Sequence, residues 1–397
     1  MMKKWLLFLV LTTVVFAQSR NLIDDNTNIS VAKTDNPAWL ISKYNGDFQN
    51  YEIVARQAVG DYKLPYEAQE IWDFNYIARG EKKLFERGLF SGYVAFHQHR
   101  LVNKKWVHNR SPYMGFPFLL ADSSMGDMTL NGIHWQLGYS HELIPDKLFL
   151  GSRLFYNVDE EMKDVFPKPI IKHRDMMFSL GIGTKLFDNI SAGLQYSYFD
   201  FQENLRTSKY SLNQDQTPLF FKIRGLDNPL IFRGETSEER KQDYTGHNFQ
   251  LDTKMTGRFA KEINVLLEYE TGNMEAVDGG AYPVDQGKMA TEVLAFTSNA
   301  TFPFIGFGEI KFSAFGEKHH YSADHPDINI EIYEYKTERL GGGFEFLWPL
   351  NKNIIFKPAV FGSSQFIERI DKFNGILQYF PFTSAGPSLG LLFPNIG

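Results

Sequence analysis

Hydrophobic and polar residues alternate along most of this chain with a period of two. In 190–199 the apolar residues fall on one face, and Ser, Gly and Gln occupy the other. The stretches 131–141, 175–186 and 248–259 repeat this pattern. Because successive side chains of a strand point to opposite faces, we predict β-strands that each carry one apolar and one polar face.

Such strands suit either a soluble β-sandwich or a membrane barrel, and three features favour the barrel. The polar face is rich in Gly, Ser and Gln, which fits a lumen better than open solvent. Many runs reach about 10 to 14 residues, whereas soluble strands centre on about 5 to 6 and membrane strands on about 9 to 11. Aromatic residues such as Tyr139, Phe187 and Trp348 stand beside the tight turns, as in the girdles of outer-membrane barrels. We therefore predict an all-β fold, a transmembrane antiparallel β-barrel.

Short turns and long polar connections alternate along the chain, as periplasmic turns and extracellular loops do in outer-membrane barrels. Applying this rule predicts about 14 strands, with both termini on the periplasmic side. In the longest loop, 202–246, we predict a hairpin of 219–224 and 230–233 above the membrane, although two more barrel strands are an alternative. The predicted strands are 50–58, 69–79, 88–99, 128–143, 147–157, 173–186, 190–200, 247–259, 262–271, 288–301, 307–319, 327–347, 354–367 and 376–393.

The N-terminus has the three parts of a secretory signal peptide. A basic start precedes an apolar core, Trp5 to Phe16, and Val15 and Ala17 occupy the −3 and −1 positions of a cleavage site. The alternative, a transmembrane anchor, needs a longer apolar run. We predict a signal peptide over 1–17, a periplasmic or plug segment over 18–49, and the barrel over 50–397. Fourteen strands enclose a radius of roughly 14 Å, so water, this segment or an infolded loop must fill the lumen.

Composition and charge exclude several classes of site. The chain has 0 Cys, which excludes disulfides, thiolate metal sites and a lipid-anchored cysteine. Its net charge is −6, so no nucleic-acid partner is expected. No spaced catalytic motif is present, and we expect neither enzyme activity nor a cofactor.

Residues Asn36, Pro37 and Ala38 form a triplet about twenty residues after the predicted cleavage site. This triplet resembles the N-terminal region of several Gram-negative outer-membrane barrels, among them the fourteen-stranded long-chain fatty-acid transporter family. The resemblance implies a plugged lumen, lateral exit of a hydrophobic substrate, and partnership with outer-membrane lipid and the barrel insertion machinery. The chain as a whole looks still more like uncharacterised barrels of this type. It departs from many of them because four residues follow the last aromatic, Phe393.

Charged residues on the polar faces are expected to point into the lumen, since charge facing lipid is costly. They form either a selectivity constriction or, as we favour, interstrand pairs that stiffen the barrel and hold a plug. The candidates are Arg153, Lys185, Asp252, Lys254, Arg258, Glu268, Glu270, Glu309 and Lys311.

Histidines gather at the predicted extracellular ends of strands, and neutral imidazole is a common ligand of metals and haem. Their spacing matches no structural zinc site, so polar rim residues are the simpler interpretation. The candidates for metal contact are His97, His99, His319, His320 and His325. Separately, Gly341, Gly342 and Gly343 interrupt a strong strand, which predicts a bend or, less simply, a lateral opening in the wall.

These features predict an outer-membrane channel or passive transporter of a Gram-negative bacterium for a small solute, hydrophobic ones included. The alternative is a non-conducting surface barrel that partners a receptor or lipoprotein, for instance in metal or haem uptake.

Overall fold

The computed structural model describes residues 36–60, 68–105, 117–207, 219–225, 230–233, 238–304, 308–327, 330–351 and 354–392. The predicted signal peptide, 1–17, and the first part of the predicted plug segment lie outside these residues. No helix in the described ranges is long and apolar enough to cross a membrane.

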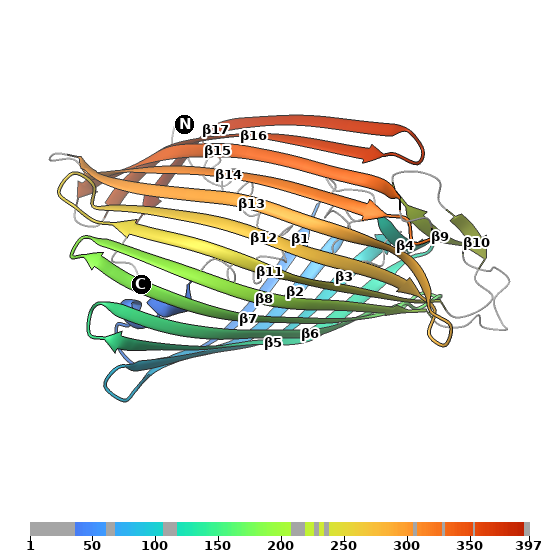
Figure 1. Ribbon diagram of the computed structural model, residues 1–397, viewed down its shortest axis with the longest axis horizontal. Coiled ribbons are helices and arrows are strands. Elements are labelled where there is room, and N and C mark those ends of the chain that lie inside the picture. The colour runs from blue at the N-terminus through green and yellow to red at the C-terminus, as the bar shows by residue number, and fades with distance from the viewer. Residues whose placement is uncertain are drawn as a thin grey trace, which may run out of the picture.

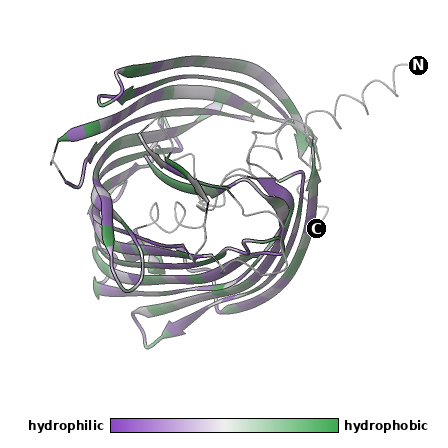
Figure 2. Cartoon of the chain, turned by 90° about the vertical axis from the view of Figure 1, so that its right-hand side faces the viewer, coloured by the Kyte–Doolittle hydropathy of each residue, from purple (hydrophilic) through white to green (hydrophobic). Residues whose placement is uncertain are grey.

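Fourteen antiparallel strands form one sheet that curls into a barrel (Figures 1 and 2). Each strand pairs with the next in the order β1-β2-β3-β5-β6-β7-β8-β11-β12-β13-β14-β15-β16-β17. Their bounds are β1 Phe48–Val59, β2 Glu70–Leu84, β3 Gly88–Lys105, β5 Met125–Ile144, β6 Leu148–Lys163, β7 Ile170–Phe187, β8 Ile190–Arg206, β11 Glu239–Met255, β12 Glu262–Asp278, β13 Val284–Phe304, β14 Gly308–Asp324, β15 Glu331–Asn351, β16 Ile354–Asp371 and β17 Ile376–Leu392.

All fourteen predicted strands are present, which confirms the predicted fold class. The main error lies in their lengths at the extracellular ends. β3 continues to Lys105 rather than ending at residue 99, and β11 begins at Glu239 rather than at 247. These extensions are paired with their neighbours. β11, for example, pairs with β8 from its first residue, Glu239, which lies opposite Arg206. The barrel therefore projects beyond the membrane, and its outer loops are shorter than predicted.

The apolar stripe of each strand faces outward, which is the reverse of a soluble sandwich. On β8 Leu194 is 57% exposed, whereas its neighbour Gln195 is 3% exposed. Phe178 and Leu251, on β7 and β11, are likewise exposed at 40% and 38%. From Ile190 to Tyr198 this stripe rises roughly 20 Å along the barrel axis, close to the ~25 Å apolar band of outer-membrane barrels. The outer surface is thus built to contact lipid.

A charge placed within this band should be costly. Leu194→Arg should lower the free energy of unfolding by about 2–4 kcal/mol, because the guanidinium would lie in hydrocarbon. Asn204→Arg is the matched control, since Asn204 lies on the same strand and face but beyond the apolar band. Urea titration of both variants folded into vesicles measures the difference. Equal stabilities would contradict the lipid-facing assignment.

Two smaller elements lie at opposite ends of the barrel. Near the periplasmic turns are the 3₁₀ helices η1 (Pro37–Trp39) and η2 (Ile41–Lys43), and η1 packs on β5, β6 and β7. Across the other opening lies a three-stranded sheet, in the order β10-β9-β4 (Figure 2). It consists of β4 (Phe118–Asp122), β9 (Leu219–Arg224) and β10 (Leu230–Arg233).

The predicted hairpin is therefore confirmed as β9 and β10, but its surroundings differ from the prediction. It does not stand free above the membrane, because β9 pairs with β4 along Phe118–Asp122, a strand that the sequence analysis missed. Nor do β9 and β10 join the barrel wall, where β8 pairs directly with β11.

Candidate functional site: the plug and the cap of the lumen

The periplasmic plug, defined here as residues 36–43, is a tight turn that starts at Asn36. The Asn36 side chain accepts a hydrogen bond from the Ala38 amide at 3.0 Å, and Pro37 occupies the first helical position. Asn is favoured as an N-cap, and Pro at the next position costs no backbone donor. The sequence thus folds this segment locally into a compact knob, with Asn36 and Ala38 buried against the wall.

Asp252 on β11 contacts two side chains of the plug. Its carboxylate accepts hydrogen bonds from Asn36 Nδ2 at 2.9 Å and from Trp39 Nε1 at 2.5 Å. Asn36 Nδ2 also lies within hydrogen-bond distance of the Leu194 carbonyl, at 3.2 Å. Hydrogen bonds to a charged acceptor are the stronger kind, so Asp252 is the main polar anchor of the plug.

Inward-facing glycines on three neighbouring strands make the groove that receives the plug. A Cβ added at Gly151 would lie 2.2 Å from the Pro37 carbonyl carbon, and one at Gly181 would lie 2.0 Å from Asn36 Oδ1. A Cβ at Gly193 would meet the amide of Asn36 at 2.6 Å. No side chain fits these positions without displacing the plug. The glycines of the polar stripe are therefore docking positions.

A short connector, Tyr44–Asp47, joins the plug to β1 and is itself attached to the wall. Asp47 accepts hydrogen bonds from the Tyr44 hydroxyl and from the Lys83 amide, the latter at 2.9 Å. Both bonds stabilise the charged carboxylate and lower the pKa of Asp47 below its usual value. The connector therefore fixes the point at which the plug leaves the wall.

The cap, defined here as the sheet β4-β9-β10, is held at the extracellular mouth by two apolar anchors. Phe118 packs in a cluster that includes Tyr321 on β14 and Tyr333 on β15. Phe220 packs beside Ile171 and Leu205, on β7 and β8. The first cluster lies on β12 to β15 and the second on β5, β7 and β8, and Figure 2 shows the cap lying across the opening.

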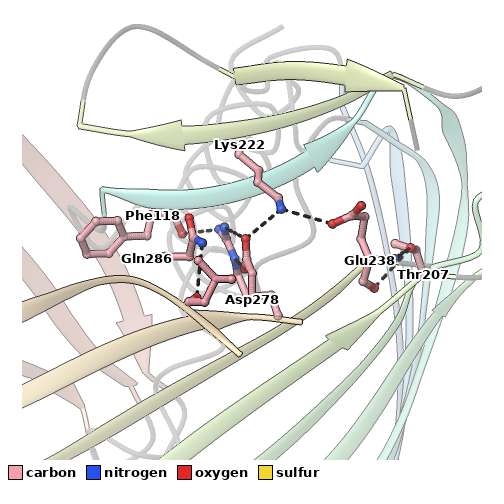
Figure 3. Close-up of polar contacts among 8 residues, drawn as sticks. Phe118, Thr207, Lys222, Glu238, Asp278 and Gln286 are labelled. Atoms are coloured by element: carbon pink, nitrogen blue, oxygen red, sulfur yellow. Dashed lines mark hydrogen bonds and ion pairs between the residues drawn. The ribbon is translucent and has the colours of Figure 1, made fainter. Parts of the chain in front are cut away.

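Buried ion pairs attach the cap to the rim. Arg240 on β11 binds Asp278 with two hydrogen bonds, of 2.6 and 3.0 Å, and donates a third to the Phe118 carbonyl at 3.2 Å. Lys222 of the cap lies between Asp278, at 3.0 Å, and Glu238, at 3.2 Å (Figure 3). These charges on two faces of the cap attach it firmly, because each carboxylate faces an ammonium or guanidinium group.

A second buried pair joins the other end of the cap to β6. Lys163 Nζ lies 3.0 Å from Asp122 Oδ1 and donates to the Ser124 carbonyl at 2.8 Å. The side chains of Lys163 and Asp122 are 2% and 0% exposed. The sequence analysis missed these contacts of the cap, since the partners are far apart in the chain.

The predicted lumen residues divide into three groups. Arg153, Glu268 and Glu270 lie on inward positions of the wall, where Arg153 is 3% exposed and Glu268 accepts a hydrogen bond from Asn248. Asp252, also on the inner face, contacts the plug as described. Whether these charges select a solute stays a prediction.

Three more of the candidates lie at the periplasmic mouth and form ion pairs. The pairs are Lys185 with Asp146 at 3.5 Å, Lys254 with Glu262 at 3.1 Å and Glu309 with Lys261 at 2.7 Å. Lys185 and Lys254 line a polar cavity of about 550 Å³ beside the plug.

The remaining two candidates, Arg258 and Lys311, are exposed to solvent. Arg258 is exposed in the turn after β11, because that strand ends at Met255 and not at 259 as predicted. The turn closes where the Gly257 amide donates to the Ala260 carbonyl. Lys311 is exposed near the start of β14.

The candidate histidines contact carboxylates or hydroxyl groups on separate parts of the wall. His97 Nε2 lies 2.6 Å from Asp159 Oδ1, and His99 lies 3.3 Å from Asp73. The rings of His97 and His134 are 5.8 Å apart, a neighbour that the sequence analysis missed because it lies on another strand, β5. These residues form a buried polar patch on β2, β3, β5 and β6.

The other three histidines lie far from this patch in the strand order. His319 on β14 bonds the Tyr321 hydroxyl at 2.8 Å, and His320 bonds Glu334 at 3.0 Å. His325, after β14, accepts a hydrogen bond from the Asp327 amide. Within the described ranges, no three His, Asp or Glu side chains are grouped so as to hold a metal ion. Metal contact stays a prediction without a built site.

The triple glycine of β15 makes room for neighbouring aromatic rings. A Cβ at Gly341 would lie 2.4 Å from Phe315, and one at Gly343 would lie 2.4 Å from Phe361. β15 stays paired with β14 and β16 throughout this stretch. The suggested lateral opening is therefore wrong at this position, where the glycines serve packing.

Comparisons with known proteins place the chain in a family. A family model described as a family of unknown function, DUF6850, matches residues 37–368. The chain belongs to DUF6850. The match begins at the first residue of η1 and ends within β16, so it includes all but the first residue of the plug of this DUF6850 chain and the barrel strands before β17. None of the curated proteins matches it in sequence.

Solved structures that resemble this DUF6850 protein are outer-membrane barrels of low sequence identity. The toluene transporter TodX from Pseudomonas putida is 10% identical, with a TM-score of 0.37 over 90% of this chain and 91% of that one. The CymD monoaromatic hydrocarbon channel is 9% identical, with a TM-score of 0.36 and the same coverage. The siderophore receptor PiuA from Acinetobacter baumannii is 9% identical, with a TM-score of 0.42 over 89% and 72%.

The compartment follows from the molecule itself. A fourteen-stranded antiparallel barrel with an exposed apolar band and a polar interior is stable only with lipid around it. This DUF6850 protein is a Gram-negative outer-membrane β-barrel.

Proposed function

We propose that this protein is a passive outer-membrane transporter whose lumen is closed at rest by the plug and the cap. The observation that carries the proposal is the double hydrogen bond from Asn36 and Trp39 to Asp252. It is part of a small set of polar contacts that attach the plug to the wall, beside the glycine groove. Such contacts can break and form again, so the plug can leave the wall and return to it. A plug that fills the lumen permanently would not need a reversible attachment.

The wall between the two closures favours a polar solute over a hydrocarbon. Most of its buried inward residues are hydroxyl, amide and charged side chains, beside one apolar cluster of Phe155, Met177 and Phe199, and an apolar molecule would have to strip water from the polar ones. Cations and carboxylates both occur there, so the wall favours neither sign strongly. Examples are Arg153, Asn157, Asp159, Ser179, Gln195, Ser197, Asn248, Gln250 and Glu270.

Swelling of proteoliposomes in solutions of neutral sugars of graded size tests the proposal. We expect slow entry of small sugars through the wild-type protein and fast entry once the plug is released by Asp252→Ala. The alternative function, a non-conducting barrel that docks a receptor or lipoprotein, predicts no entry in either case. Absence of sugar entry through both proteins, with correct folding shown by heat-modifiable mobility on gels, would refute transport.

A further inference from the structure

The outward face of the strands changes character just beyond the apolar band. On β7 the outward residue after Met176 is Arg174, and on β8 the outward residue after Tyr198 is Asp200. On β15 Glu338 follows Leu340 in the same way. Apolar residues that face lipid thus give way to charged ones where the strands leave the hydrocarbon.

These outward charges form ion pairs, most of them between adjacent strands, which we call the outer ion-pair belt. Such exposed pairs typically contribute only about 0–1 kcal/mol, so fold stability alone does not account for them. The belt consists of Lys172–Glu160, Arg174–Asp200, Arg206–Glu239, Lys288–Glu275 and Lys318–Glu338.

In each pair of the belt the cation is more exposed than its carboxylate partner. Arg174 is 44% exposed and Asp200 is 24% exposed, while Arg206 and Glu239 are 72% and 34% exposed. The lysine is also the more exposed partner in Lys172–Glu160, Lys288–Glu275 and Lys318–Glu338. The carboxylates hold the cations in place, and the cations face the surroundings.

We propose that the outer ion-pair belt binds the phosphate groups of lipid headgroups in the outer leaflet. Lys172, Arg174 and Lys318 lie within two outward positions of the apolar band, which places these cations at headgroup depth, whereas Arg206 and Lys288 lie farther out along their strands. Arginine and lysine are the side chains that bind phosphate, arginine with two parallel hydrogen bonds. Phosphate oxygens can accept hydrogen bonds from each cation on the side that does not face its own carboxylate.

The belt carries equal numbers of acids and bases, and this balance suits a lipid partner. An unbalanced ring of cations would repel itself before lipid is bound, whereas a paired ring is stable in both states. Binding then needs only that each cation turns part of its donors toward a phosphate. The proposal concerns the outer surface, so it stands or falls separately from transport through the lumen.

Native mass spectrometry of the purified protein, supplied with defined lipids, tests the belt. The variant Lys172→Gln/Arg174→Gln/Lys318→Gln removes three exposed cations next to the apolar band, and Lys261→Gln is the control. Lys261 is a similarly exposed cation, 67%, paired with Glu309 at the opposite, periplasmic end. The probes are bisphosphorylated lipid A, its fully dephosphorylated form and inorganic phosphate.

We expect the triple variant to lose bound bisphosphorylated lipid A by about 10-fold or more, as the loss of roughly 1.4 kcal/mol or more of binding free energy would give. The Lys261→Gln control should bind as the wild type does. Equal binding by the triple variant and the wild type would overturn the proposal. So would an equal loss of the dephosphorylated lipid, or competition by millimolar inorganic phosphate that removes the lipid from the wild type.

Discussion

Replacing Asp252 by alanine should open the periplasmic end of the barrel. The substitution removes the acceptor for Asn36 Nδ2 and for Trp39 Nε1. Each hydrogen bond to a charged group contributes about 1.5–3 kcal/mol, so their joint loss should raise the ratio of undocked to docked plug by roughly 100-fold or more. In planar bilayers the variant should show sustained conductance where the wild type shows rare, brief openings.

Two further variants make this prediction specific. Lys254→Ala removes a neighbouring charge of the same cavity that pairs with Glu262 and not with the plug, and it should conduct as the wild type does. Gly181→Val should mimic Asp252→Ala, because its side chain would occupy the place of Asn36 Oδ1. A closed Gly181→Val channel would show that the plug does not depend on this groove.

Replacing Lys163 by alanine should release the cap. It leaves the Asp122 carboxylate, whose side chain is 0% exposed, without its ammonium partner. Removing one partner of a buried ion pair typically costs about 3–5 kcal/mol, far more than an exposed pair contributes. The barrel itself keeps its ladders, so the loss should appear as local opening of the cap and not as unfolding of the whole protein.

The absence of native cysteine makes the measurement direct, since the chain has 0 Cys. Leu120 lies in β4 and is 1% exposed, so Leu120→Cys should react slowly with a maleimide. Adding Lys163→Ala should raise the reaction rate by roughly 100-fold, whereas Lys172→Ala, which breaks the exposed pair with Glu160, should leave it unchanged. Unchanged labelling in the Lys163→Ala background would mean that the apolar anchors alone hold the cap.

The sequence predicts the barrel well because its signal is local. Each strand repeats a two-residue pattern over many positions, and neighbouring strands in the chain are neighbours in the sheet. β4 escapes this reading, because Phe118–Asp122 is short and is buried on both faces, with no alternation to mark it. The strand extensions escape it too, since polar residues there are held by pairing and not by an apolar stripe.

The candidate site is predictable only in part, for the same physical reason. Asn36 and Asp252 each look notable in the sequence, one as a turn residue and one as an inward charge. Their contact joins positions 216 residues apart, and no local pattern encodes that pairing. Gly151 and Gly181 read as features of a crowded lumen, and only the packed structure shows that they make room for one segment.

The place of the plug in the chain sets the order in which the molecule can be assembled. Residues 36–43 are synthesised before any strand of the barrel, yet the surfaces that receive them belong to β5, β6, β7, β8 and β11. Docking must therefore wait until these five of the fourteen strands have come together. A barrel with a misplaced strand in this part would offer the plug no matching groove, so docking of the plug reports that this part of the wall has been assembled correctly.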